Sequence, residues 1–241
     1  MSSVAIKYRI ILPDSRERVF TLQLDKDSAL LVSPGPYESP AWTRLAFHQC
    51  EGCPLQAADA LHCPAALHLS GVIDGFADLV SYDTVRVTVE SEERSVTATL
   101  SAQQALSSLM GLIMASSGCP RTAVFRPMAR FHLPFSSEAE TAYRVASMYL
   151  LAQHFVARDG GSPDVTLERL ERVYSGMHAV NRGMAQRLRA ASRQDAVVNA
   201  IVLLDVYSSL VPAAIHDILE EMRPAFAALL SDSPTSKHKS V

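Results

Sequence analysis

The chain has 241 residues, a length that corresponds to one or two domains of ordinary size. Hydrophobic residues make up 48% and charged residues 20% of it, so the chain can bury a real core, and disorder as the dominant state is excluded. The 22 basic and 25 acidic residues give a net charge of −3, which excludes a strongly cationic nucleic-acid binder as the default interpretation.

Two β-hairpins are predicted in the first half of the chain. Residues 4–12 and 18–25 are rich in β-forming side chains, and Pro13 to Arg16 between them have turn composition. Apolar and polar residues alternate again over 84–89 and 96–100. This alternation predicts that the second hairpin buries one of its faces.

Two helices and a short strand are predicted around the second hairpin. Residues 42–47 favour a short strand, and apolar residues recur at helical spacing over 67–80. Ser101 and Gln104 form a capping box that opens the second helix, which is expected to stop at Gly118.

From residue 136 onward the apolar spacing is helical, which predicts a bundle of about four helices. Ser137 and Glu140 form a capping box for the first helix, and Asp164 is expected to cap the second. The last two helices are expected over 195–210 and 212–230.

These elements predict an α+β fold, with N-terminal antiparallel β-hairpins and two helices followed by a C-terminal helical bundle. We expect an α+β region over residues 1–135, the bundle over 136–230 and a disordered polar tail over 231–241.

The location of the protein follows from its apolar segments. Residues 1–9 carry charges where a signal peptide needs an apolar stretch. The longest apolar stretch, residues 196–215, contains Asn199, Asp205 and Pro212, which makes it a poor membrane span. We therefore expect a cytoplasmic protein with no membrane partner, in which reducing conditions disfavour disulfides.

All four cysteines lie in the first half of the chain, at Cys50, Cys53, Cys63 and Cys119. The C-x2-C spacing of the first pair lets two thiolates face one point, and Gly52 permits the tight turn that this needs. Four thiolates complete the ligand set of a tetrahedral zinc ion or of a four-iron cluster. We therefore predict one metal site with these four residues as its ligands.

Three of the cysteines, Cys53, Cys63 and Cys119, are followed directly by proline. Proline pushes the preceding residue toward extended geometry and so pre-orders each ligand. The ligands do not form two local C-x2-C pairs, the usual form of structural zinc sites, and this favours an iron–sulfur cluster slightly over zinc. Three alternatives stay open, namely inert buried thiols, a redox-active pair and a haem-responsive Cys-Pro sensor.

The charge of such a centre needs compensation. Zinc or an oxidised four-iron cluster with four thiolates carries about −2, whereas residues 94–137 contain no acidic residue. The cations that could balance this charge, or bind another anion, are Arg94, Arg121, Arg126, Arg130 and His132. His48, two residues before Cys50, is a further candidate as a ligand or as a hydrogen-bond partner of one.

Four motifs carry a resemblance to a protein family. They are HQCEGCPL at 48–55, SLMGLIMASSGCP at 108–120, RPMARFHLPF at 126–135 and YLLAQHF at 149–155. Over residues 42–210 the chain resembles an uncharacterised bacterial protein family that carries these motifs. The resemblance implies no activity and no catalytic residue.

Motifs of common enzyme classes do not occur, since the sequence has no G-x-G-x-x-G, P-loop, G-x-S-x-G or H-E-x-x-H. We therefore expect a metal-binding protein without catalytic chemistry, with a regulatory, adaptor or electron-transfer role and a protein partner rather than nucleic acid. The alternative from another class is a cluster-dependent redox enzyme with an anion pocket lined by Arg126, Arg130 and His132.

Overall fold

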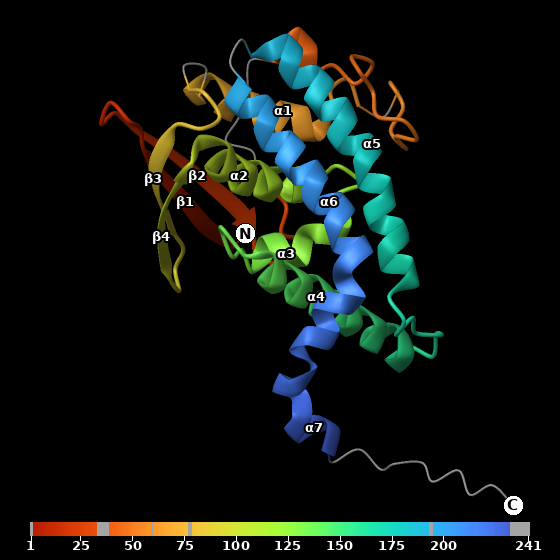
Figure 1. Cartoon of the computed structure of the whole chain (residues 1–241). Helices are drawn as coiled ribbons and strands as arrows, with labels where there is room; N and C mark the ends of the chain where they lie inside the picture. Colours follow the sequence, from red (N-terminus) through yellow and green to blue (C-terminus); the bar gives the residue numbers. More distant parts are fainter. Residues whose placement is uncertain (1, 33–38, 59, 77–78, 193–194, 232–241) are drawn as a thin grey trace, which may run out of the picture.

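The computed structural model describes residues 2–32, 39–58, 60–76, 79–192 and 195–231. A four-stranded sheet lies on one side of the molecule and the helices lie on the other (Figure 1). The strands are β1 (Ser3–Ile11), β2 (Glu17–Asp25), β3 (Thr84–Glu90) and β4 (Ser95–Ser101). The α-helices are α1 (Pro64–Ile73), α2 (Ala102–Ser116), α3 (Arg126–Arg130), α4 (Glu138–Arg158), α5 (Glu168–Ala191), α6 (Asp195–Met222) and α7 (Ala227–Ser231). Short 3₁₀ helices are η1 (Ala41–Thr43), η2 (Asp74–Phe76), η3 (Ala123–Phe125) and η4 (Arg223–Phe226).

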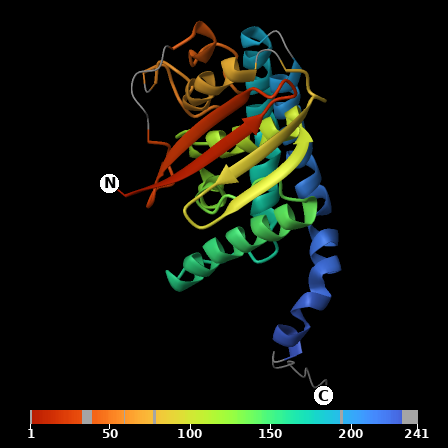
Figure 2. The ribbon, with the colours of Figure 1, turned by 90° about the vertical axis from the view of Figure 1, so that its left-hand side faces the viewer.

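The sheet consists of the two predicted hairpins, joined side by side in the order β2-β1-β3-β4. All its pairings are antiparallel, and β1 pairs with both β2 and β3. Alternate residues of β1, from Val4 to Ile10, are buried on the face that meets the helices. The other face carries exposed polar residues and is turned to the viewer in Figure 2. The prediction of an α+β fold with antiparallel hairpins is therefore confirmed.

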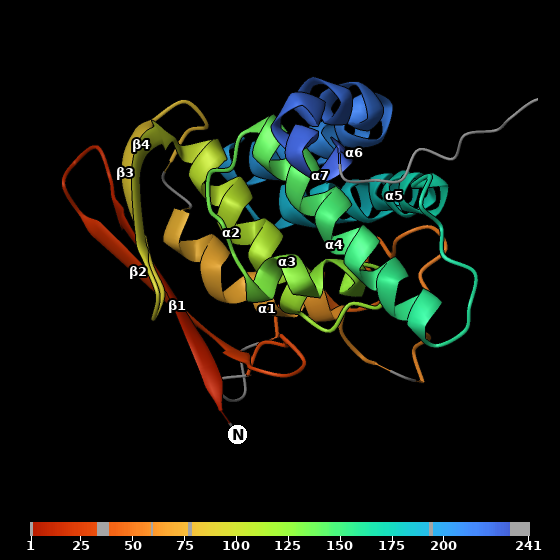
Figure 3. The same cartoon turned by 90° about the horizontal axis from the view of Figure 1, so that it is seen from below.

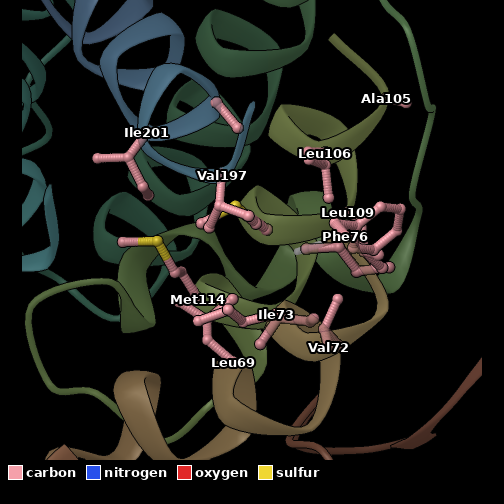
Figure 4. Close-up of a cluster of buried hydrophobic side chains, with 14 of the residues drawn as sticks. Leu69, Val72, Ile73, Phe76, Ala105, Leu106, Leu109, Met114, Val197 and Ile201 are labelled. Carbon is pink, nitrogen blue, oxygen red and sulfur yellow. The ribbon is translucent and has the colours of Figure 1, made fainter. Parts of the chain in front are cut away.

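The helix α2 runs through the centre of the molecule, between the sheet and α6 (Figure 3). Its apolar side chains meet the sheet on one side and helices on the other, so Leu106, Leu109, Met110, Leu112 and Ile113 are almost completely buried. Figure 4 shows Leu109 of α2 in one cluster with Leu69 of α1 and Ile201 of α6.

One hydrophobic core extends across the predicted boundary at residue 135. Met184 and Leu188 of α5 and Val197 of α6 belong to the same cluster as the buried residues of the sheet. A second, smaller cluster joins α4, α5 and α6 around Tyr149 and Tyr174. The helices after residue 135 thus supply part of the core on which the sheet packs.

Two local predictions in the first half are wrong. Residues 42–47 do not form a strand, because Thr43 bonds back to the Pro40 carbonyl oxygen through its N–H and its hydroxyl, which closes η1. The first helix covers Pro64–Ile73 rather than 67–80, since Pro64 fits the first turn of a helix and the chain continues into η2 after Ile73.

The last long helices also differ from the prediction. Pro212 does not separate two helices, and α6 continues through it to Met222. The chain bends by 72° between Asp195–Ser209 and Ala214–Ser231, as expected where a proline interrupts the helical hydrogen bonds. Among the described helices none is by itself long and apolar enough to cross a membrane, although this bent pair meets the length and composition criteria. The predicted tail lies outside the described residues after Ser231.

Candidate four-cysteine site

The first two cysteines stand on a tight turn. The N–H of Cys53 donates to the carbonyl oxygen of Cys50 at 3.0 Å, and Gly52 between them has a φ of +65°. This left-handed conformation favours glycine, as the C-x2-C spacing predicts. Gln49 donates a side-chain hydrogen bond to the Leu55 carbonyl oxygen and so ties the two ends of the turn together.

The third cysteine, Cys63, occupies the N-cap position of α1. Its own N–H donates to the Thr43 carbonyl oxygen, which fixes it beside η1. Burial raises the pKa of the Cys63 thiol, while the backbone N–H groups of Ala66 and Ala65 and the guanidinium of Arg187 act in the opposite direction. A thiolate at this position would therefore find donors and positive charge ready for it.

The fourth cysteine, Cys119, follows α2 directly after Gly118, which has a φ of +86° and turns the chain out of the helix. The hydroxyl of Thr122 donates to the Met114 carbonyl oxygen at 2.6 Å, and the Cys119 N–H donates to the Ser117 hydroxyl at 3.3 Å. These bonds satisfy the end of α2 and hold Cys119 next to it.

The four thiols gather in one region. Burial raises the pKa of the Cys50 thiol to about 11, and the charges of Cys63, Cys119 and Cys53, in that order, raise it further. Cys63 is buried in the main core, and Cys53 and Cys119 pack against that core. Residues from separate segments thus come close enough to influence one another's ionisation.

The helix α5 forms the surface against which the C-x2-C turn lies (Figure 1). The Cys50 thiol is directed at the Val180 carbonyl oxygen, with 3.9 Å between the sulfur and the oxygen. A Cβ atom at Gly183 would lie 2.9 Å from the Cys50 sulfur and 3.2 Å from the His48 carbonyl oxygen. Glycine at 183 therefore allows the turn to approach the helix backbone.

Arg121 supports the turn from the outside. Its guanidinium donates to the carbonyl oxygens of Glu51, Gly52 and Gly176, so it connects the C-x2-C turn to α5. Its predicted role in balancing the charge of a metal centre stays a prediction.

Arg187 supports the site from the inside and was missed by the sequence analysis. It is 1% exposed, and its guanidinium donates to the carbonyl oxygens of Trp42, Arg44 and Leu45. Burial raises the pKa of both Cys50 and Cys63, and the positive charge of Arg187 offsets part of that rise. The periodicity of α5 could have revealed it, because position 187 follows the buried Val180 and Met184 on the same helical face.

The other predicted cations lie elsewhere. Arg130 and His132 line a cavity at the sheet, where His132 bonds to Tyr8, which in turn bonds to Ser108 of α2. From Ser108 to Ser116, the last residue of α2, the helix extends about 12 Å at 1.5 Å per residue. Cys119 follows that end of α2, so it lies away from the cavity. Arg126 lies in the first turn of α3, where its Nε is buried without a partner.

His48 lies at the surface beside the C-x2-C turn. The residue is exposed, and its ring meets the Phe47 ring edge-on with 4.6 Å between the ring centroids. Its φ of +45° helps to turn the chain into the cysteine pair. Its predicted role as a ligand stays a prediction.

Within the described part of the chain, no three side chains of His, Cys, Asp or Glu are placed so that they could hold a single metal ion. A tetrahedral zinc ion with bonds of about 2.3 Å would hold its sulfur ligands roughly 3.8 Å apart. The charge effects on Cys50 and Cys63 can act over longer distances than this. The four thiols are therefore neighbours without the close packing of zinc ligands, and metal binding stays a prediction.

Comparison with known proteins identifies one family. A family model described as a domain of unknown function, DUF6901, matches residues 6–227, which is most of the chain and includes all four cysteines. No curated protein and no solved structure matches the chain.

Proposed function

The chain belongs to the DUF6901 family, whose description assigns no function, and from its own residues we propose that it is a non-catalytic iron–sulfur protein. In this proposal Cys50, Cys53, Cys63 and Cys119 bind a four-iron cluster. The observation that carries the proposal is that Cys50 lies near the other three cysteines, and that the charge of the buried Arg187 guanidinium acts on both Cys50 and Cys63.

Charge supports an anionic occupant of this region. Arg187 is buried, and within the described residues no carboxylate lies within 4.0 Å of its guanidinium. Three carbonyl oxygens accept from its two terminal nitrogens, its Nε is buried without a partner, and none of these contacts neutralises its charge. A buried cation needs a negative partner, and a thiolate-ligated centre with a charge of about −2 would supply one.

Spacing supports a cluster over zinc. A cubane of four irons and four sulfides holds its thiolates farther apart than a single zinc ion does. In the sequence, the four cysteines do not form the two local C-x2-C pairs that are usual for structural zinc sites. Structural zinc is therefore the second candidate, and it would require the four sulfurs to move closer together.

The role of the cluster is proposed to be regulatory, adaptor-like or electron-transferring, with a protein partner. Only Cys63 is buried, whereas Cys50, Cys53 and Cys119 are partly exposed. A cluster held in this way would exchange electrons or respond to oxidants at the surface. The proposal includes a cytoplasmic location, because a reducing compartment keeps free thiols available for the cluster.

Anaerobic purification tests the proposal directly. We expect a brown protein with broad visible absorption, about four irons and an equal amount of acid-labile sulfide per chain. Replacing each cysteine by serine in turn should remove most of the bound iron. The matched control, Thr99→Ala, changes an exposed side chain of β4 that does not contact the cysteines, and it should keep the iron. One zinc per chain would overturn the cluster, and a folded protein with neither metal would overturn metal binding altogether.

A further inference from the structure

A cavity of about 150 Å³ lies at the sheet, away from the cysteines. Strands β1, β3 and β4, the turn between β3 and β4, and the segment after α3 all contribute to its lining. Its floor is apolar, because Val4, Ile6 and Val89 present the buried face of the sheet there. The cavity is as large as one that accepts a benzene molecule.

Two arginines at this cavity have no acidic partner. Arg94 and Arg130 both line it, and no carboxylate of the described chain lies within 4.0 Å of either guanidinium. The Arg130 guanidinium lies 5.2 Å from the centroid of the Phe131 ring, which holds it near the opening. Glu93 is the one acidic side chain among the described lining residues, so the lining carries a net positive charge.

A third cation, Arg144, contacts the segment that lines the cavity. Arg144 of α4 donates to the carbonyl oxygens of Met128 and Phe131, which positions the segment that carries His132. Burial lowers the pKa of Arg144, and the positive charge of Arg94 lowers it further, so these two side chains lie in one region of positive potential. Such a region attracts anions.

His132 adds a neutral hydrogen-bonding group. Burial, with a smaller effect from Arg144, lowers its pKa to about 3, so the imidazole is uncharged at neutral pH. Its Nε2 lies 2.6 Å from the hydroxyl of Tyr8, which also lies 2.9 Å from the Ser108 hydroxyl. When Tyr8 donates to Nε2, the proton of His132 is on Nδ1, which has no partner within the described residues.

We propose that this cavity binds a small carboxylate with a compact apolar body. The carboxylate meets the guanidinium groups of Arg94 and Arg130 and accepts from Nδ1 of His132, while the apolar body covers Val4 and Val89. Paired guanidinium and carboxylate groups make the strongest hydrogen bonds of this kind. The proposal is independent of the cysteine site, because none of its residues belongs to that site.

Benzoate is the probe, and isothermal titration calorimetry at constant ionic strength is the measurement. Benzamide has the same shape without the charge, and inorganic phosphate has charge without an apolar body. We expect benzoate to bind with a Kd below about 1 mM and both comparison compounds to bind at least tenfold more weakly. No binding of benzoate, or equal binding of phosphate, would overturn the proposal.

Variants of the cavity make the test specific. Arg94→Gln and Arg130→Gln should each weaken benzoate binding about tenfold, whereas Arg86→Gln should not. Arg86→Gln is a matched control, because it removes the same charge from the exposed face of the sheet. Val96→Phe fills the cavity without changing its charge and should abolish binding. Equal losses in Arg86→Gln and Arg130→Gln would reduce the effect to general attraction by charge and refute a specific site.

Discussion

At the scale of single residues, Arg187 connects parts of the chain that are far apart in sequence. Its guanidinium reaches the Trp42 carbonyl oxygen, 145 positions earlier in the chain, together with two further carbonyl oxygens of that segment. These three backbone groups lead directly into the C-x2-C turn. The position of Cys50 and Cys53 therefore depends on one side chain of α5.

Replacing Arg187 by methionine is expected to lower the free energy of unfolding by about 3–5 kcal/mol. The apolar side chain fills much of the space but leaves buried carbonyl oxygens without donors. Urea denaturation measures the change. Arg189→Met, on the exposed side of the same helix, should change the stability by less than about 0.5 kcal/mol. Equal stability of both variants would show that Arg187 does not hold the segment.

His132 predicts a pH dependence of stability. Its pKa is about 3 in the folded protein and 6.5 when unperturbed, so the unfolded chain takes up a proton first as the pH falls. The contribution of the neutral imidazole is complete above pH 6.5 and is lost progressively toward pH 3. Between pH 7.5 and pH 5 this loss amounts to about 2 kcal/mol.

The variant His132→Gln checks this, because it cannot titrate. The free energy of unfolding of the wild type should fall more steeply between pH 7.5 and pH 5 than that of His132→Gln. His154→Gln removes an exposed histidine of α4 and should keep the wild-type slope. Parallel curves for all three proteins would contradict the lowered pKa of His132.

At the scale of elements, α5 both packs into the main core and contacts the segment that carries the first two cysteines. Its apolar residues enter the main core, and its glycines let the cysteine turn and Arg121 approach the backbone. A glycine inside a helix normally costs about 0.5–1 kcal/mol relative to alanine. At positions 176 and 183 this cost accompanies close contacts that a Cβ atom would disturb.

Gly183→Ala and Gly111→Ala are expected to have opposite effects. At Gly183 the new Cβ atom would meet the Cys50 sulfur at 2.9 Å and nearby backbone, so the turn must shift and stability falls. At Gly111 of α2 the nearest atom is the end of Leu204 at 3.4 Å, so alanine should stabilise by up to about 1 kcal/mol. Thermal unfolding of the two variants measures the difference. A gain of stability in both would show that the turn does not need the glycine.

At the scale of the whole molecule, the core is shared by the sheet and the late helices. Residues of α5 and α6 complete the cluster that begins on β1 and passes through α2. A sheet with one apolar face is stable only when another layer covers it. The helices α1 and α2 provide part of that layer, and α5 and α6 close its outer side.

The fragment 1–135 is therefore expected not to fold by itself. Without Met184, Leu188 and Val197 the core loses apolar partners from α5 and α6, and α2 becomes exposed. Circular dichroism during heating should show no cooperative transition for this fragment, whereas the full chain should unfold in one main transition. A cooperative transition of the fragment would instead establish residues 1–135 as an independent domain.

Some features were decided by the sequence alone, because their physical causes act within a few residues. The hairpins follow from local composition, alternation and turn residues, and the capping boxes of Ser101 and Ser137 form as their spacing predicts. The tight turn at Gly52 belongs to the same class. Asp164 is not the predicted N-cap residue, because Leu167 takes that position, but its carboxylate accepts the N–H of Arg169 in the first turn of α5.

Other features were decided only by the tertiary structure, because they join residues that are distant in the chain. Arg187 rather than Arg130 stands beside the cysteines, since helix packing determines which cation enters the core. His132 bonds to Tyr8 on β1 for the same reason. Hydrophobic periodicity tells which face of a helix is buried, but the partner of that face, and so the surroundings of each charge, depends on how all layers fit together.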